Sequence, residues 1–124
     1  MPLGSFAMNR RWIVVDIVVV LLFVVIGRSN HHHGEGASGI VSTTWPFAVG
    51  LAVGWLAVLV RHQNGGSLGA GVVVWLATVA LGMTLRVIAG QGIAFAFVVV
   101  ALGFLGVFML GLRVAHARLF NRST

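Results

Sequence analysis

The sequence predicts an all-α integral membrane protein, a bundle of four transmembrane helices, and three observations carry this prediction. Hydrophobic residues make up 59% of the 124 residues and charged residues only 8%, whereas soluble domains average about 45–50% apolar and about 25% charged residues. A soluble chain this short could not bury so much apolar surface. The apolar residues fall into four runs, at about residues 12–27, 40–60, 68–89 and 93–112. We therefore expect a single membrane domain, residues 1–124, covered by the lipid bilayer.

The first run is the shortest. A crossing helix needs roughly 20 residues, so residues 12–27 span the membrane only if Met8 to Arg11 extend them, with the arginines snorkelling to the interface. The alternative is a cleaved signal peptide, but no A-x-A-like site follows the run and Asp16 interrupts it. Residues 1–7, MPLGSFA, resemble a cloning remnant, with Met8 as the candidate natural start, so we do not count them toward the first helix.

The three later runs are long enough to cross the membrane, and the connections between the runs carry turn residues. Residues 28–39 are polar and glycine-rich, and residues 61–67 hold the turn sequence Asn-Gly-Gly. Residues 90–92, GQG, make the tightest connection, so we expect the third and fourth helices to be antiparallel neighbours. The tail from Arg113 onward can prolong the fourth helix along the membrane surface.

The basic residues are all arginines, and most lie at the ends of apolar runs, which leaves no basic face for a nucleic acid. Arginine bias predicts instead that both termini are cytoplasmic in a multi-pass plasma-membrane protein. The predicted cytoplasmic side holds Arg10, Arg11, Arg61, Arg113, Arg118 and Arg122. The predicted outer side holds Arg28 and Arg86, offset by Glu35.

Helical spacing groups the small residues of each run with its polar or charged residue. In the third helix Thr78 and Arg86 lie on or near the face that carries its glycines. In the first helix Asp16 begins a line of residues along one face. Small residues let membrane helices approach closely. We therefore predict helix packing at Gly50, Gly54, Gly82, Gly103 and Gly106. GWLAV at 54–58 and GFLGV at 103–107 are alike, so the bundle is read, on a weak signal, as two similar helical hairpins.

A set of landmarks runs along the chain: Asp16, Gly27, Arg28, Trp45, Pro46, Phe47, Gly54, Trp55, Val74, Trp75, Leu76, Gly82, Met83, Arg86, Phe97, Val98, Val99 and Val100. Together they resemble a family of small prokaryotic four-helix membrane proteins classed as a domain of unknown function. The resemblance covers about residues 12–113 and implies the four-helix membrane fold, but no activity or substrate.

Asp16 is the main candidate site because a charge near the bilayer centre costs about 2.5–3.5 kcal/mol on insertion scales. The first interpretation is an ion pair with Arg61 or Arg113 that sets the register of the first helix. The second is a proton- or cation-coupled transport site. The third is solvent exposure at a thinned or kinked boundary. Arg28 and Arg86 are predicted to snorkel or pair locally, or else to form an anion-attracting outer mouth.

An enzyme is not expected, since the sequence holds no catalytic motif and its two carboxylates are predicted on opposite sides of the membrane. His31, His32 and His33 are weak metal candidates in a glycine-rich loop. No cofactor is expected. The best functional hypothesis is a transporter or channel subunit for a small ion or solute, and a homo-oligomer, because four helices enclose little volume. The alternative is a non-transporting scaffold or accessory protein that binds a partner or lipid.

Overall fold

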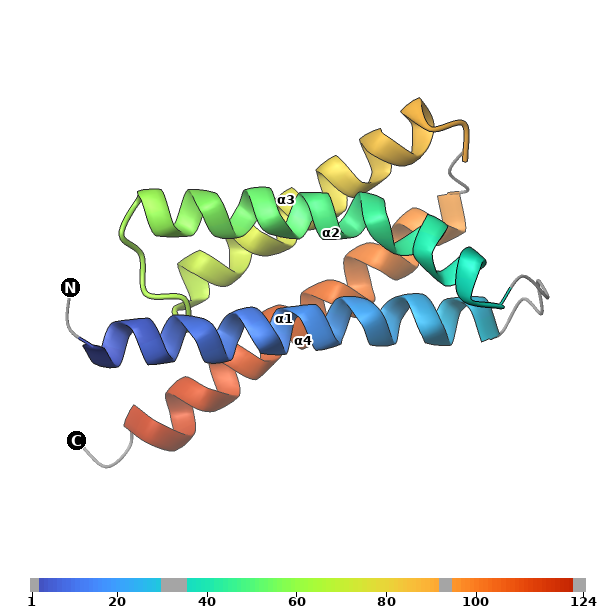
Figure 1. Cartoon of the computed structure of the whole chain (residues 1–124). Helices are drawn as coiled ribbons and strands as arrows, with labels where there is room; N and C mark the ends of the chain where they lie inside the picture. Colours follow the sequence, from blue (N-terminus) through green and yellow to red (C-terminus); the bar gives the residue numbers. More distant parts are fainter. Residues whose placement is uncertain (1–2, 30–35, 92–94, 122–124) are drawn as a thin grey trace.

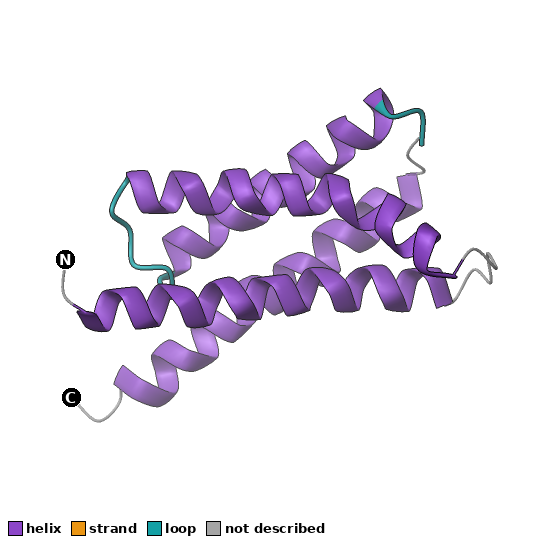
Figure 2. Ribbon diagram, in the orientation of Figure 1, coloured by secondary structure: helices purple, strands orange, loops and turns teal. Residues whose placement is uncertain are grey.

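The computed structural model describes residues 3–29, 36–91 and 95–121, and side chains over 9–27, 41–91 and 95–119. Within these ranges the chain is entirely helical apart from its connections, which confirms the all-α prediction (Figures 1 and 2). The helices are α1 (Leu3–Ser29), α2 (Gly36–Val60), α3 (Leu68–Ile88) and α4 (Phe95–Asn121). The predicted helices are therefore confirmed, but α1 already begins in the segment set aside as a cloning remnant. The tail prolongs α4, as expected.

The four helices close into a ring in which each packs on its chain neighbours and α1 also packs on α4. Figure 1 shows α1 and α2 side by side, with α3 and α4 crossing behind them. The start of α1, the connection between α2 and α3, and the end of α4 lie at one end of the bundle. The predicted neighbours α3 and α4 are in contact, but the most extensive contact joins α2 and α3, across the boundary between the two predicted hairpins.

Small residues allow the close contact between α2 and α3. A Cβ atom on Gly50 would lie 2.8 Å from the Ala77 carbonyl oxygen, and one on Gly54 would lie 3.0 Å from Val74 Cα. On the facing helix Thr78 is fully buried, and its hydroxyl donates to the Val74 carbonyl at 2.7 Å. The interface is thus free of an unpaired hydroxyl at this point, and the packing predicted for these two glycines is present.

Aromatic rings cover two further glycines. A Cβ on Gly82 would lie 2.5 Å from Phe47 Cδ1, and one on Gly106 would lie 3.0 Å from the Trp75 ring. The packing prediction is wrong for Gly103, which is exposed and where an added Cβ would meet nothing within 4 Å. The reason is angular, because residues three apart differ by about 60° around a helix of 3.6 residues per turn. Gly106 therefore lies within the contact between α3 and α4, and Gly103 lies outside it.

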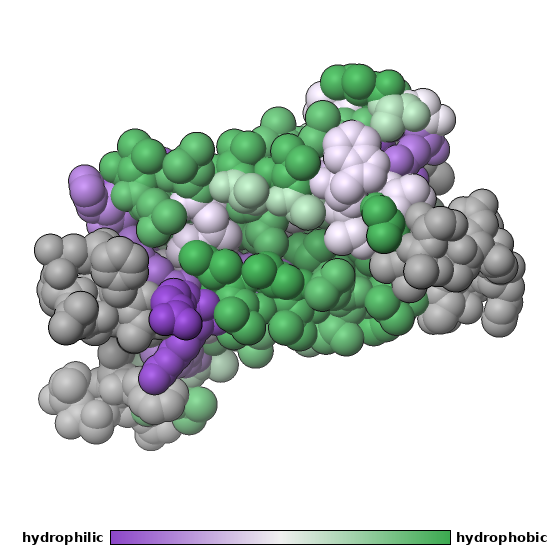
Figure 3. All heavy atoms as spheres, in the orientation of Figure 1, coloured by the Kyte–Doolittle hydropathy of each residue, from purple (hydrophilic) through white to green (hydrophobic). Residues whose placement is uncertain are grey.

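Three helices have the length and composition to cross a membrane: Val41–Val60, Leu68–Ile88 and Phe95–Leu119. The described part of α1 is not among them, because it carries Arg10, Arg11 and Asp16 close together. Large apolar side chains on all four helices, α1 included, point away from the bundle. Figure 3 shows them as a green surface over the middle of this face, with hydrophilic side chains toward the ends. Such a surface is expected to face lipid.

We expect Gly50→Ala to destabilise the bundle by about 1–3 kcal/mol, the usual cost of overpacking, because the added methyl group would meet α3 backbone. Gly103→Ala is the matched control, since its methyl group enters open space. Thermal unfolding in detergent measures both. Equal stability of the two variants would contradict the α2–α3 packing described here.

Candidate functional site: a buried ion pair between the first and last helices

Asp16 and Arg113 meet in the interior of the bundle. Asp16 is 0% exposed and Arg113 only 1% exposed. One terminal guanidinium nitrogen of Arg113 donates to Asp16 Oδ1 at 3.0 Å and the other donates to Oδ2 at 2.8 Å. This bidentate geometry suits the planar guanidinium and is the strong form of the contact. It joins α1 directly to α4, the first helix of the chain to the last.

Most of the remaining hydrogen-bonding groups of the pair are also occupied. Trp55, from α2, donates its indole N–H to Asp16 Oδ2 at 2.9 Å. Arg113 Nε donates to the Gly65 carbonyl at 2.9 Å, and one terminal nitrogen also donates to the Met109 carbonyl at 3.0 Å. A buried ion pair repays its desolvation only when such additional hydrogen bonds satisfy its remaining groups. The pair therefore has the partners that a stable buried charge requires.

The connection between α2 and α3 covers the pair. Gly65 accepts from Arg113 through its carbonyl, and its N–H donates to the Asn9 side-chain oxygen of α1 at 2.9 Å. A Cβ on Gly65 would lie 2.5 Å from the Trp55 ring and 2.7 Å from Asn9 Oδ1. Only glycine fits this position. One residue of the loop is thus held by both the first and the last helix.

The ring of Trp12 packs on the guanidinium from the α1 side. The Arg113 Cζ atom lies 4.8 Å from the centre of the Trp12 ring, a cation–π distance. His116, one turn further along α4, meets the same ring edge-on at 5.5 Å between centroids. A Cβ on Gly66 would lie 2.6 Å from Trp12 Nε1. Trp12 therefore packs between α4 and the loop at this end of the bundle.

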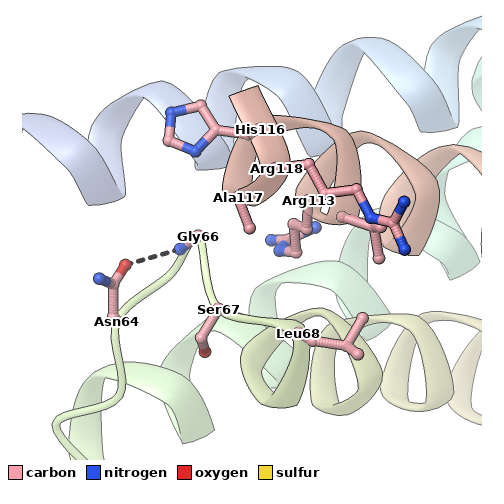
Figure 4. A pocket seen from close by; sticks show the side chains of 9 residues that line it. Asn64, Gly66, Ser67, Leu68, Arg113, His116, Ala117 and Arg118 are labelled. Carbon is pink, nitrogen blue, oxygen red and sulfur yellow. Dashed lines mark hydrogen bonds between the residues drawn. The ribbon is translucent and has the colours of Figure 1, made fainter. Parts of the chain in front are cut away.

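A hollow of about 500 Å³ lies beside the pair, between the start of α3 and the end of α4. Arg113, His116 and Arg118 line it from α4, and Ser67 and Leu68 line it from the opposite side (Figure 4). Ser67 caps α3 by accepting the Ala70 N–H at 3.1 Å. Arg113 thus belongs both to the buried pair and to the wall of an open hollow.

The structure decides which of the two arginines predicted as partners of Asp16 forms the ion pair. Arg113 forms the pair, whereas Arg61 is exposed in the connection after α2. The difference is geometric, because the α2 position facing Asp16 is already filled by Trp55. Of the three interpretations of Asp16, solvent exposure is wrong, since the carboxylate is completely buried.

Arg86 makes a separate cluster at the other end of the bundle. Its guanidinium carbon lies 4.7 Å from the Phe97 ring centre, and one nitrogen donates to Gln91 Oε1 at 3.1 Å. Gln91 in turn donates to the Ser42 carbonyl at 2.9 Å. The cluster ties the end of α3 to α4 and to the early part of α2.

The other predicted candidates lie outside the described residues or side chains. This holds for the side chain of Arg28 and for residues 31–33 and 35, so the outer mouth and the weak metal site stay predictions. Among the described residues no group of three potential metal ligands gathers.

Comparison with known proteins gives a family. The model of the family described as "Protein of unknown function (DUF3054)" matches residues 13–116, a stretch that contains both Asp16 and Arg113. The chain belongs to this family. A search among curated proteins and a search among solved structures each gave no match. The resemblance to a family of unknown function is thereby confirmed, and the ion pair lies wholly inside the matched segment.

Sequence reasoning missed Asn9, Trp12, Trp55 and Gly65 as members of this site. Trp55 enters the sequence analysis only among the residues of the family resemblance, and no link between its indole N–H and Asp16 is drawn there. A usable signal existed: a buried carboxylate needs several donors, and Trp55 lies in a helix expected to pack on the first one. Gly65 could not be found in this way, because its role depends on where the loop folds back.

We expect Asp16→Asn to destabilise the protein by about 3–5 kcal/mol, because it leaves the Arg113 guanidinium buried without a counter-charge. Trp55→Phe removes one hydrogen bond to a charged group and should cost less, about 1.5–3 kcal/mol. Unfolding in detergent measures both, with Arg61→Gln as the exposed control.

The double variant Asp16→Asn/Arg113→Gln should recover part of the stability lost in Asp16→Asn, since no unpaired charge remains. An Asp16→Asn variant as stable as the parent would rule out the stabilising pair.

Proposed function

We propose that the protein is a non-enzymatic, non-transporting membrane scaffold or accessory protein whose Asp16–Arg113 pair holds its helices in register. One observation carries this proposal: both oxygens of Asp16 are engaged by three donors from Arg113 and Trp55. A carboxylate that exchanges protons or cations must release its partners in each cycle, at the cost of leaving a buried charge unpaired. A permanent join between α1 and α4 fits these contacts better.

The proposed arrangement in the membrane has four spanning helices, with both termini in the cytoplasm of the cell. Three spans meet the length and hydropathy requirement, and α1 joins them because its apolar outward side chains continue the lipid-facing surface. Five arginines, Arg10, Arg11, Arg61, Arg113 and Arg118, belong to the end formed by the α2–α3 connection and the tail. Arg28, next to the last residue of α1, and Arg86 belong to the other end. This asymmetry supports a cytoplasmic placement of the arginine-rich end.

A small-ion or solute transporter or channel subunit is the second candidate, and one observation favours it. Arg113 contacts both Asp16 and the hollow, so movement of its side chain could open the pair to water. Asp16 would then be the coupling or gating residue. A through-pore would require a homo-oligomer, because the bundle interior is filled by side chains such as Phe47, Leu105 and Met109.

Topology is tested with single cysteines, which the natural sequence lacks. Ala89→Cys, exposed at the end of α3, should react with an impermeant thiol reagent on intact cells. His62→Cys, exposed in the connection between α2 and α3, should react only after the cells are opened. The reverse labelling pattern would place the arginine-rich end outside and reject the proposed orientation.

The role is tested by flux through purified protein in liposomes under gradients of protons, common cations and small anions. We expect no flux above empty liposomes for the parent, and none for Asp16→Asn, because the pair is a fixed join. Protein in the liposomes is first shown to be folded by its unfolding transition. Flux through the parent protein that is absent in a folded Asp16→Asn variant would reject the scaffold role and support the transporter.

A further inference from the structure

The hollow between α3 and α4 has a chemical character that the ion pair does not explain. Its apolar wall is formed by Leu68, Val114 and Ala117, and Leu68 and Val114 are 52% and 38% exposed. Its basic side is formed by Arg113 and Arg118 with His116. Figure 4 shows Ala117 and Arg113 projecting from α4 toward the chain at 66–68. An apolar wall beside a cationic group matches the junction of a lipid headgroup with its acyl chains.

Among the described residues no acidic side chain pairs with Arg118. Asp16, the acidic side chain of the described ranges, is held by Arg113 and Trp55 in the interior. Arg118 is exposed on α4, so its guanidinium is open to an anion from outside the bundle.

The start of α3 adds a weaker attraction for anions at the same place. The first turn of a helix has backbone N–H groups without intrahelical acceptors, and the helix dipole favours negative charge there. Ser67 caps the N–H of Ala70, and Leu68, the first residue of α3, lines the hollow. The dipole and Arg118 thus act on the same small volume from opposite sides.

We propose that this hollow binds the phosphate of an anionic phospholipid, with Arg118 as the principal contact and an acyl chain along Leu68, Val114 and Ala117. Basic pockets between membrane helices on the cytoplasmic side bind such headgroups. An inorganic phosphate is the less suitable ligand, because the apolar wall of Leu68, Val114 and Ala117 would offer it no side-chain hydrogen bond. The proposal rests on the membrane arrangement proposed above, in which this end lies at the cytoplasmic interface. It does not depend on whether the protein transports.

The test measures binding of phosphatidylglycerol to the purified protein in detergent by native mass spectrometry, with thermal unfolding as a second readout. Phosphatidylcholine and inorganic phosphate are the comparison ligands. We expect phosphatidylglycerol to bind in preference to both, and Arg118→Gln to weaken it about fivefold, the equivalent of about 1 kcal/mol for one basic residue near an anionic surface. Arg61→Gln, an exposed arginine at the same end but outside the hollow, should change binding less than twofold.

A second variant tests the apolar wall without changing charge. Ala117→Phe fills the hollow beside Arg118 and should weaken phosphatidylglycerol binding at least as much as Arg118→Gln. Equal losses in Arg61→Gln and Arg118→Gln would mean general surface attraction and reject the site. Equal binding of phosphatidylcholine, full competition by inorganic phosphate, or an unaffected Ala117→Phe variant would reject the lipid. None of these readouts reports on flux, so the scaffold role and the lipid site can fail separately.

Discussion

A charge placed in an apolar interior needs a counter-charge and a complete set of hydrogen bonds, and the arginine-rich end of this bundle is organised by that need. Asp16 draws Arg113 from α4 and Trp55 from α2. Arg113 in turn binds the carbonyl of Gly65, whose N–H reaches Asn9. The pair thus connects three helices and one loop that are far apart along the chain, and most of the polar contacts at this end depend on it.

Such a join has a clear use in a bilayer. Between membrane helices the hydrophobic effect supplies little specific attraction, because lipid tails are as apolar as the side chains they replace. Close packing of small residues provides it between α2 and α3, where Gly50 and Gly54 meet backbone. Among the described residues the contact between α1 and α4 has no comparable glycine seam, and there the ion pair supplies the register instead. Glycine packing therefore holds α2 against α3, and the ion pair holds α1 against α4, on two different sides of the ring of helices.

The two ends of the bundle differ in a way that bears on function. At the Arg86 end, the guanidinium is used within the fold, against Phe97 and Gln91. At the other end Arg113 is used within the fold, while Arg118 lines an open hollow next to exposed apolar residues. A protein that only spans the membrane does not require such a hollow. The hollow lies directly beside the arginine that joins α1 to α4, whose own side chain is buried.

The sequence by itself determined the all-helical class and the four helices and marked Asp16 as a candidate, because hydropathy, helix length and the cost of a buried charge act locally along the chain. The family followed from the resemblance of its motifs. Tertiary structure alone decided which arginine pairs with Asp16, that Trp55 and Gly65 complete the site, and that Gly103 faces outward. These depend on how far each helix is rotated about its axis and where a loop folds back. A rotation of a fraction of a turn moves a residue from interface to lipid without altering the hydropathy pattern, so no one-dimensional pattern records it.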